Sequence, residues 1–233
     1  MKKIGFIGAY DKSDLIINVA KILQLLDYKV MVADTTLMQK TRYIVPAINP
    51  TKSYITDFEN IDFAVGFESL EDIEEYLGVT FKGINDEGDL GLYDYMLIDI
   101  DNPEVLENME VRQLDNKYFV TSFDSYSLKK GIQIFDGIDR QMKLTKVLFS
   151  YEMSQENEER LNNLSLEYRI EWSSFSLYFH INNEDSQVLQ ENEQFEKIRF
   201  KRLSNNYKDS LMYLVQDIDR SQSSMKLKKL MKE

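Results

Sequence analysis

Residues 1–34 constrain the fold most, because they read as a strand, a loop, a helix and a second strand. The apolar run Ile4–Ile7 predicts a short buried strand, and Gly8 ends it. From Leu15 to Leu26 apolar residues recur three and four positions apart, which is the spacing of a helix. Lys29–Asp34 then reads as a second buried strand with a polar end. Two strands joined through a helix lie parallel in one sheet, so this unit predicts an α/β fold.

Apolar runs continue to alternate with helical patterns along the rest of the chain. Further strands are expected at Asp62–Gly66, Tyr95–Asp99, Lys117–Thr121, Lys146–Phe149 and Ser176–His180. Helices are expected at Leu70–Leu77, Ser125–Ile138, Glu156–Asn162, Glu184–Asn192 and Tyr207–Ile218. This alternation favours a mostly parallel sheet covered by helices on both faces. The chain has three prolines, nine glycines and no shift in composition, so we expect residues 1–220 to form a single domain.

The composition excludes several classes of function. The formal net charge is −12, and an acidic surface repels phosphates, so we expect no general nucleic-acid binding. There is no cysteine, which excludes disulfides, cysteine-ligated zinc and thiol catalysis. The chain runs from Met1-Lys2-Lys3 into a short apolar run, and no apolar stretch is long enough to cross a membrane. We therefore expect a cytoplasmic protein.

The residues expected to carry chemistry lie at the carboxyl ends of the predicted strands, where open parallel sheets bind ligands. The first of these loops begins at Gly8 and ends in Lys12-Ser13 at the start of the helix. Such a loop can hold phosphate groups with its amides, while the lysine neutralises phosphate charge. Asp34 and Asp99 end two of the strands. The predicted nucleotide site therefore comprises Gly8, Lys12, Ser13, Asp34 and Asp99, with Ser13 and Asp99 as magnesium ligands.

The loop and the two strand-end aspartates follow one another along the chain in an order that resembles the motifs of the MinD/ParA family of P-loop NTPases. This resemblance in order covers roughly residues 1–218. The loop of that family ends in Gly-Gly-X-Gly-Lys-Thr/Ser, and Lys12-Ser13 matches its last pair. Asp34 lies 22 residues after Lys12, where the family has its first switch aspartate. Tyr95–Asp99 resembles the Walker B strand, and Asn102-Pro103 is similar to the turn after it, displaced by two residues. The resemblance implies a P-loop NTPase-like fold.

Three positions depart from the family pattern. Asp11 stands where the loop should have a glycine, Ile7 replaces a signature lysine, and Thr36 replaces a second switch aspartate. A carboxylate at position 11 repels phosphate, and its β-carbon restricts the turn that directs the amides. We therefore expect ATP and Mg²⁺ to bind weakly or not at all, and efficient ATP hydrolysis to be absent.

The resemblance leaves three functional interpretations. Relatives of the TadZ or CpaE kind, which position pilus-assembly machines, are similar in having atypical loops, and they imply a localisation or assembly scaffold. Such a scaffold is expected to be a homodimer with protein partners in the machine. The second interpretation is an ATP-dependent dimerisation switch with slow hydrolysis at the same site. The third is a Rossmann-type enzyme that binds a dinucleotide, for which Gly5-X-X-Gly8 and Asp34 are an imperfect match.

Residues 221–233 form a basic C-terminal tail. Met225–Glu233 contains four lysines and one acid, and Leu227, Leu230 and Met231 share one face of a helical projection. This segment is expected either to be a solvated terminus or to make peripheral contact with an anionic membrane. The C-terminal membrane-targeting helix of MinD resembles this arrangement.

Each signal also has a purely structural interpretation. Lys12-Ser13 can be an ordinary helix start, with Ser13 or Asp11 as its N-cap. Asp99 and Asp101 can simply face solvent at a strand end. His180, the only histidine, has no visible catalytic partners and is expected to be structural. The aromatic residues are expected to serve in packing, because we see no basic residues interleaved with them.

Overall fold

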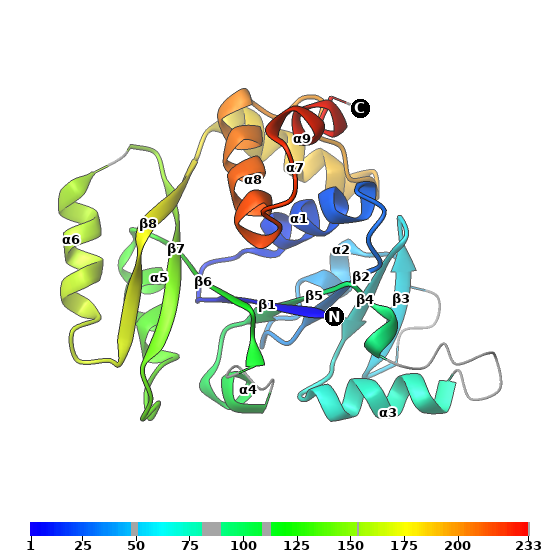
Figure 1. Cartoon of the computed structure of the whole chain (residues 1–233), viewed down its shortest axis with the longest axis horizontal. Coiled ribbons are helices and arrows are strands. Elements are labelled where there is room, and N and C mark those ends of the chain that lie inside the picture. The colour runs from blue at the N-terminus through cyan, green and yellow to red at the C-terminus, as the bar shows by residue number, and fades with distance from the viewer. Residues whose placement is uncertain (48–50, 81–89, 109–112, 153, 233) are drawn as a thin grey trace.

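The computed structural model describes residues 1–47, 51–80, 90–108, 113–152 and 154–232. The chain forms one sheet with helices on both of its faces (Figure 1). The strands are β1 (Lys2–Ile7), β2 (Val30–Asp34), β3 (Tyr54–Phe58), β4 (Ile61–Val65), β5 (Tyr95–Ile100), β6 (Asn116–Ser122), β7 (Met142–Ser150) and β8 (Ile170–His180). The helices are α1 (Ser13–Leu25), α2 (Thr41–Ile44), α3 (Leu70–Thr80), the short 3-10 helix η1 (Leu90–Leu92), α4 (Pro103–Asn108), α5 (Ser125–Gln133), α6 (Gln155–Leu164), α7 (Asn183–Gln194), α8 (Asn205–Ile218) and α9 (Ser224–Leu230).

The order of the strands in the sheet is β3-β4-β2-β5-β1-β6-β7-β8, and all neighbours are parallel except β3 and β4. Strand β1 lies between β5 and β6, so Ile4 pairs with both Leu97 and Asn116. The chain moves from β1 toward one edge of the sheet and returns past β1 toward the other. The carboxyl end of β1 is therefore the point where the direction of winding reverses, which is where such sheets bind ligands.

The sequence did not predict β3, which pairs antiparallel with β4. Only Glu59 and Asn60 separate the two strands, and both have positive φ, at 53° and 62°. Positive φ at both central residues is the geometry of a two-residue hairpin whose twist matches its strands. The sheet is therefore mostly parallel, as predicted, and at this edge a short hairpin replaces a helical crossover.

Helices cover both faces, as predicted. One core cluster packs α1, α7, α8 and α9 against the sheet, and the other packs α3, α4, α5 and α6 against the opposite face (Figure 1). Helix α5 ends at Gln133, although its apolar pattern predicted a helix to Ile138. Ile134 and Phe135 are buried in the turn after the helix, which explains the longer pattern. Strands β7 and β8 begin four and six residues earlier than predicted, at Met142 and Ile170, and the other predicted strands and helices are present with small shifts of their ends.

The tail is a helix that packs into the body of the protein. Ser223 caps α9 by accepting a hydrogen bond from the amide of Lys226. Leu227 and Met231 are 0% and 1% exposed and belong to the core cluster that contains α1 and α8. The apolar face that the sequence offered to a membrane is thus covered by the protein itself. Membrane contact through these two side chains would require α9 to leave the body.

Glu233 lies outside the described residues. Within the described ranges, no helix is both long and apolar enough to cross a membrane.

Candidate functional site

The loop between β1 and α1 is closed around its own lysine. The ammonium of Lys12 donates a hydrogen bond to the carbonyl oxygen of Gly8 at 2.8 Å. It also lies 2.6 Å from Oδ1 of Asp99, and the two side chains are only 2% and 4% exposed. The structure therefore brings Gly8, Lys12 and Asp99 together, but with the charge of the lysine already neutralised and turned away from solvent.

Gly8 allows the loop to pass close to β6. A β-carbon built on Gly8 would lie 2.0 Å from the carbonyl oxygen of Val120, and the φ angle of Gly8 is +153°. The amide of Gly8 donates to the carbonyl of Ile100 at 3.0 Å. Any other residue would push the end of β1 away from β6. In this structure Gly8 thus serves the close packing of strand ends.

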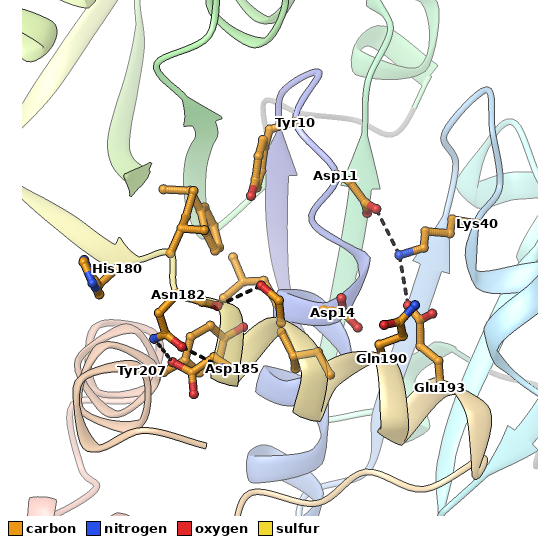
Figure 2. A pocket seen from close by; sticks show the side chains of 15 residues that line it. Tyr10, Asp11, Asp14, Lys40, His180, Asn182, Asp185, Gln190, Glu193 and Tyr207 are labelled. Atoms are coloured by element: carbon orange, nitrogen blue, oxygen red, sulfur yellow. Dashed lines mark hydrogen bonds and ion pairs between the residues drawn. The ribbon is translucent and has the colours of Figure 1, made fainter. Parts of the chain in front are cut away.

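Asp11 ties the loop to both α1 and α7. Its Oδ1 accepts the amide of Ser13 at 3.1 Å, and its Oδ2 lies 3.0 Å from the ammonium of Lys40. Lys40 also lies 3.0 Å from Oε1 of Glu193, so one lysine bridges two carboxylates (Figure 2). Burial raises the pKa of Asp11, but the charge and hydrogen bond of Lys40 outweigh it and hold that pKa below its usual value.

Asp34 is used to shape the segment that follows β2. Its Oδ1 accepts hydrogen bonds from the amide and hydroxyl of Thr36, at 3.1 and 2.6 Å. Its Oδ2 accepts the amide of Thr41 at 2.9 Å, at the start of α2. Thr36, at the position of the family's second switch aspartate, is therefore a hydrogen-bond partner of Asp34. Both oxygens of the Asp34 carboxylate thus accept hydrogen bonds from the segment that directly follows β2.

Asp99 sits in the centre of this charged region. Strands β2 and β5 place Asp34 directly beside it in the register. Burial raises the pKa of Asp99, Lys12 opposes that rise, and the nearby charge of Asp34 adds to it. The ammonium of Lys12 therefore favours the charged form of Asp99, but it only partly offsets burial, and the pKa of Asp99 stays raised, at about 7.

A pocket of 420 Å³ opens beside the loop, bounded by α7 and by the ends of β7 and β8 (Figure 2). Its charged lining contains four carboxylates and one lysine: Asp11, Asp14, Asp185, Glu193 and Lys40. Lys12, Ser13, Asp34 and Asp99 are not among the described residues that line it. The predicted site residues are thus adjacent to the pocket but buried behind its wall.

Sequence reasoning missed the aromatic wall of this pocket. The ring of Tyr10 stacks on Phe149 with centroids 4.8 Å apart, and Phe149 stacks on Phe179 at 4.9 Å. Burial, followed by the charge of Asp11, raises the pKa of Tyr10 to about 12. The available signal was that Tyr10, Phe149 and His180 all stand at carboxyl ends of strands. His180 lines the pocket.

Asp14, in the first turn of α1, gives the site a pH dependence that can be measured. Burial raises its pKa to about 6, with Lys40 opposing. In the unfolded chain an aspartate titrates near about 3.9, so between these values the folded state binds more protons. The ionised carboxylate therefore lowers the free energy of unfolding as pH rises through this window. We expect Asp14→Asn to raise that free energy by up to about 3 kcal/mol at pH values above the window.

Thermal unfolding at two pH values tests this expectation. At about pH 8 the melting temperature of Asp14→Asn should exceed that of the wild type by several degrees, while near about pH 4 the two should be close. Asp139→Asn, which changes an exposed aspartate, is the matched control and should show neither effect. An equal gain at both pH values would contradict the titration of Asp14 as its cause.

As arranged, these residues do not fit Mg-ATP. A phosphate group needs the ammonium of Lys12, which Asp99 and the carbonyl of Gly8 already hold. The amide of Ser13 is donated to Asp11, and the exposed carboxylate of Asp11 would face the phosphate. The carboxylates of the adjoining pocket add to that repulsion. Binding at this loop would require Lys12 to leave Asp99.

Comparisons with known proteins identify the fold. No protein-family model matches the sequence, and no curated protein matches it. Among solved structures, a chain of the MinC:MinD cell division protein complex from Aquifex aeolicus is 12% identical, with a TM-score of 0.58 over 96% of this chain and 97% of that one. A ParA family ATPase from Chlorobium tepidum is 13% identical, with a TM-score of 0.59 over 94% and 98% of the two chains.

The septum site-determining protein MinD from Pyrococcus horikoshii, solved in complex with Mg-ADP, is 16% identical. Its TM-score is 0.56 over 94% of this chain and 96% of that one. These likenesses span nearly the whole length of both chains. They confirm the predicted α/β fold of MinD/ParA type, and at such low identity they concern the fold alone.

Proposed function

We propose that this protein is a localisation or assembly scaffold with a MinD/ParA-type fold, and that it acts without efficient ATP hydrolysis. The observation that carries the proposal is the buried pair between Lys12 and Asp99, which closes the loop that would otherwise hold phosphate. Asp11 strengthens the argument, because its carboxylate occupies the amide of Ser13 and stands at the position of a loop glycine. The chain has the fold of these proteins, but the residues at the position of the nucleotide site are buried in the interior.

Exposed apolar side chains at the carboxyl edge of the sheet support a role in protein contacts. Leu37 and Met38 follow β2, Tyr126 follows the end of β6, and Tyr151 follows β7, and all four are exposed. Large exposed apolar groups gathered at one edge are typical of interaction surfaces. We assign this edge to a homodimer contact.

Further partners would belong to an assembly or positioning machine. MinD of Aquifex aeolicus is found in a complex with MinC. For this chain we propose a machine of the pilus-assembly kind, on the strength of its atypical loop and of the TadZ/CpaE resemblance. We place the scaffold in the cytoplasm. Contact with the membrane through Met225–Glu233 would be an additional function, conditional on release of α9.

Thermal unfolding with and without millimolar Mg-ATP tests the proposal. A ligand at a hundredfold excess over its Kd stabilises the native state by about 2.7 kcal/mol. For a chain of this size that is a rise of several degrees in melting temperature. We expect no rise, because phosphate would have to displace the buried partner of Lys12. The oligomeric state, measured by sedimentation, should be a dimer with or without nucleotide.

Two variants sharpen this experiment, each compared with its own ligand-free melting temperature. Lys12→Ala removes the lysine, and Asp11→Gly removes the carboxylate that repels phosphate. A rise in the wild type that disappears in Lys12→Ala, together with nucleotide-dependent dimerisation, would refute the scaffold and establish the ATP-dependent switch. A rise with NAD in place of ATP would favour the dinucleotide enzyme. Gly5 gives that enzyme no support, because it lies inside β1, where a β-carbon built on it would lie 2.4 Å from the side chain of Leu114.

A further inference from the structure

The turn between α7 and α8 is a second basic segment, besides the C-terminal tail, on a protein of net charge −12. Residues 195–203 read Phe-Glu-Lys-Ile-Arg-Phe-Lys-Arg-Leu, with four basic residues and one acid. Buried Ile198, Phe200 and Leu203 anchor it in the core, and the basic residues between them are exposed. The expectation that no basic residues interleave with aromatic ones is therefore wrong for this segment. We call it the basic turn.

The basic turn curves around a pocket of 390 Å³ against the last part of α7. All four of its cations line this pocket: Lys197, Arg199, Lys201 and Arg202. Arg202 forms an ion pair with Glu191, which also lines the pocket. Among the described residues, no carboxylate lies within ion-pair distance of the other three cations. The pocket therefore carries an excess of about three positive charges.

Like charges around one cavity repel each other, and an anion bound among them relieves that repulsion. Arginine and lysine together are the side chains that hold phosphate groups most effectively. The cavity has the size of a small-ligand site, and the ring of Phe195, 66% exposed, adds an apolar wall. The formal charge of −12 disfavours a long nucleic acid as the anion.

We propose that this pocket binds a phosphate group, carried either by a lipid headgroup or by a small soluble molecule. The site is independent of the closed loop at Lys12 and does not rest on the proposed scaffold function. It lies in the helical layer that contains α7, α8 and α9 (Figure 1). The ammonium of Lys208, in the first turns of α8, donates to the carbonyl of Lys201 at 3.0 Å and holds the basic turn in place.

Two binding measurements distinguish the sources of the phosphate. Inorganic pyrophosphate, titrated into the full chain by calorimetry, represents a soluble ligand. Cosedimentation with phosphatidylcholine vesicles, with and without phosphatidylglycerol, represents an anionic lipid surface. The pocket variant combines Lys197→Gln, Arg199→Gln and Lys201→Gln. The matched control combines Lys226→Gln, Lys229→Gln and Lys232→Gln on the tail, which changes the net charge equally and leaves the pocket intact.

We expect the wild type to bind one of the two probes. Each removed cation should weaken that binding about fivefold, so the pocket variant should bind about a hundredfold more weakly. The tail control should bind nearly as well as the wild type. The proposal is overturned if neither probe binds, or if the tail control loses binding as much as the pocket variant does. Loss in the tail control alone would overturn it too, and would assign vesicle contact to α9.

Discussion

Replacement of Lys12 by methionine is expected to lower the free energy of unfolding by about 3–5 kcal/mol. The methionine keeps the apolar stem of the side chain but leaves Asp99 buried without its cation. An uncompensated charge in the interior is costly, and Asp34 beside it makes the field still more negative. Urea denaturation monitored by circular dichroism measures the change. If Lys12 instead pointed into solvent, toward a phosphate site, its replacement by methionine would change the free energy of unfolding very little.

Two further variants isolate the ion pair as the cause. Lys228→Met breaks an exposed pair with Asp209 of nearly the same length, 2.9 Å, and should change stability by less than about 1 kcal/mol. The double variant Lys12→Met with Asp99→Leu removes both buried charges, and it should recover most of the lost stability. If Lys12→Met is no more destabilising than Lys228→Met, the loop is not closed in solution.

Replacement of Leu227 by alanine is expected to lower the free energy of unfolding by about 2–5 kcal/mol. The side chain is fully buried among residues of α1 and α8, so truncation removes apolar contacts and leaves a cavity. Met225→Ala is the matched control on the same helix, because Met225 is exposed, and it should change stability by about 0.5 kcal/mol or less. Chemical denaturation of both variants gives the comparison.

This pair of variants also decides how the tail is used. If Leu227→Ala and Met225→Ala have equally small effects, α9 is detached in solution and its apolar face is available to a membrane. A large effect of Leu227→Ala alone would mean that α9 belongs to the folded body. Its lysines and the exposed Met225 could then still meet an anionic surface, but its buried apolar face could not.

The parts of the fold that sequence predicts best are those set by local periodicity. The unit from Ile4 to Asp34 could be read directly, because apolar spacing changes from strand to helix and back within a few residues. Strand β3 could not, because its five residues pair with β4 through a turn that uses Glu59 and Asn60 in place of glycine. The packing of α9 could not be predicted either, because the sequence pattern of an apolar helical face is the same whether lipid or protein covers it.

The candidate site likewise has some features that the sequence predicts and others that it does not. The loop, Lys12 and Asp99 could be placed at one end of the sheet, because parallel strands bring their carboxyl ends together. That the lysine turns inward depends on the distance between two strand ends, which residue spacing does not encode. The basic turn was missed for a different reason. It lies at a turn between helices, away from the sheet edge where we expected all of the chemistry.

The order of strands in the sheet also has a consequence for how the chain folds. Strands β6, β7 and β8 are neighbours both along the chain and in the sheet, so they can assemble through short crossovers. Strand β1 has only distant neighbours, β5 and β6, and the entropy of closing such long segments must be overcome before they pair. Lys12 and Asp99 are 99 − 12 = 87 positions apart. We therefore expect the ion pair between Lys12 and Asp99 to form late in folding, once the centre of the sheet has assembled.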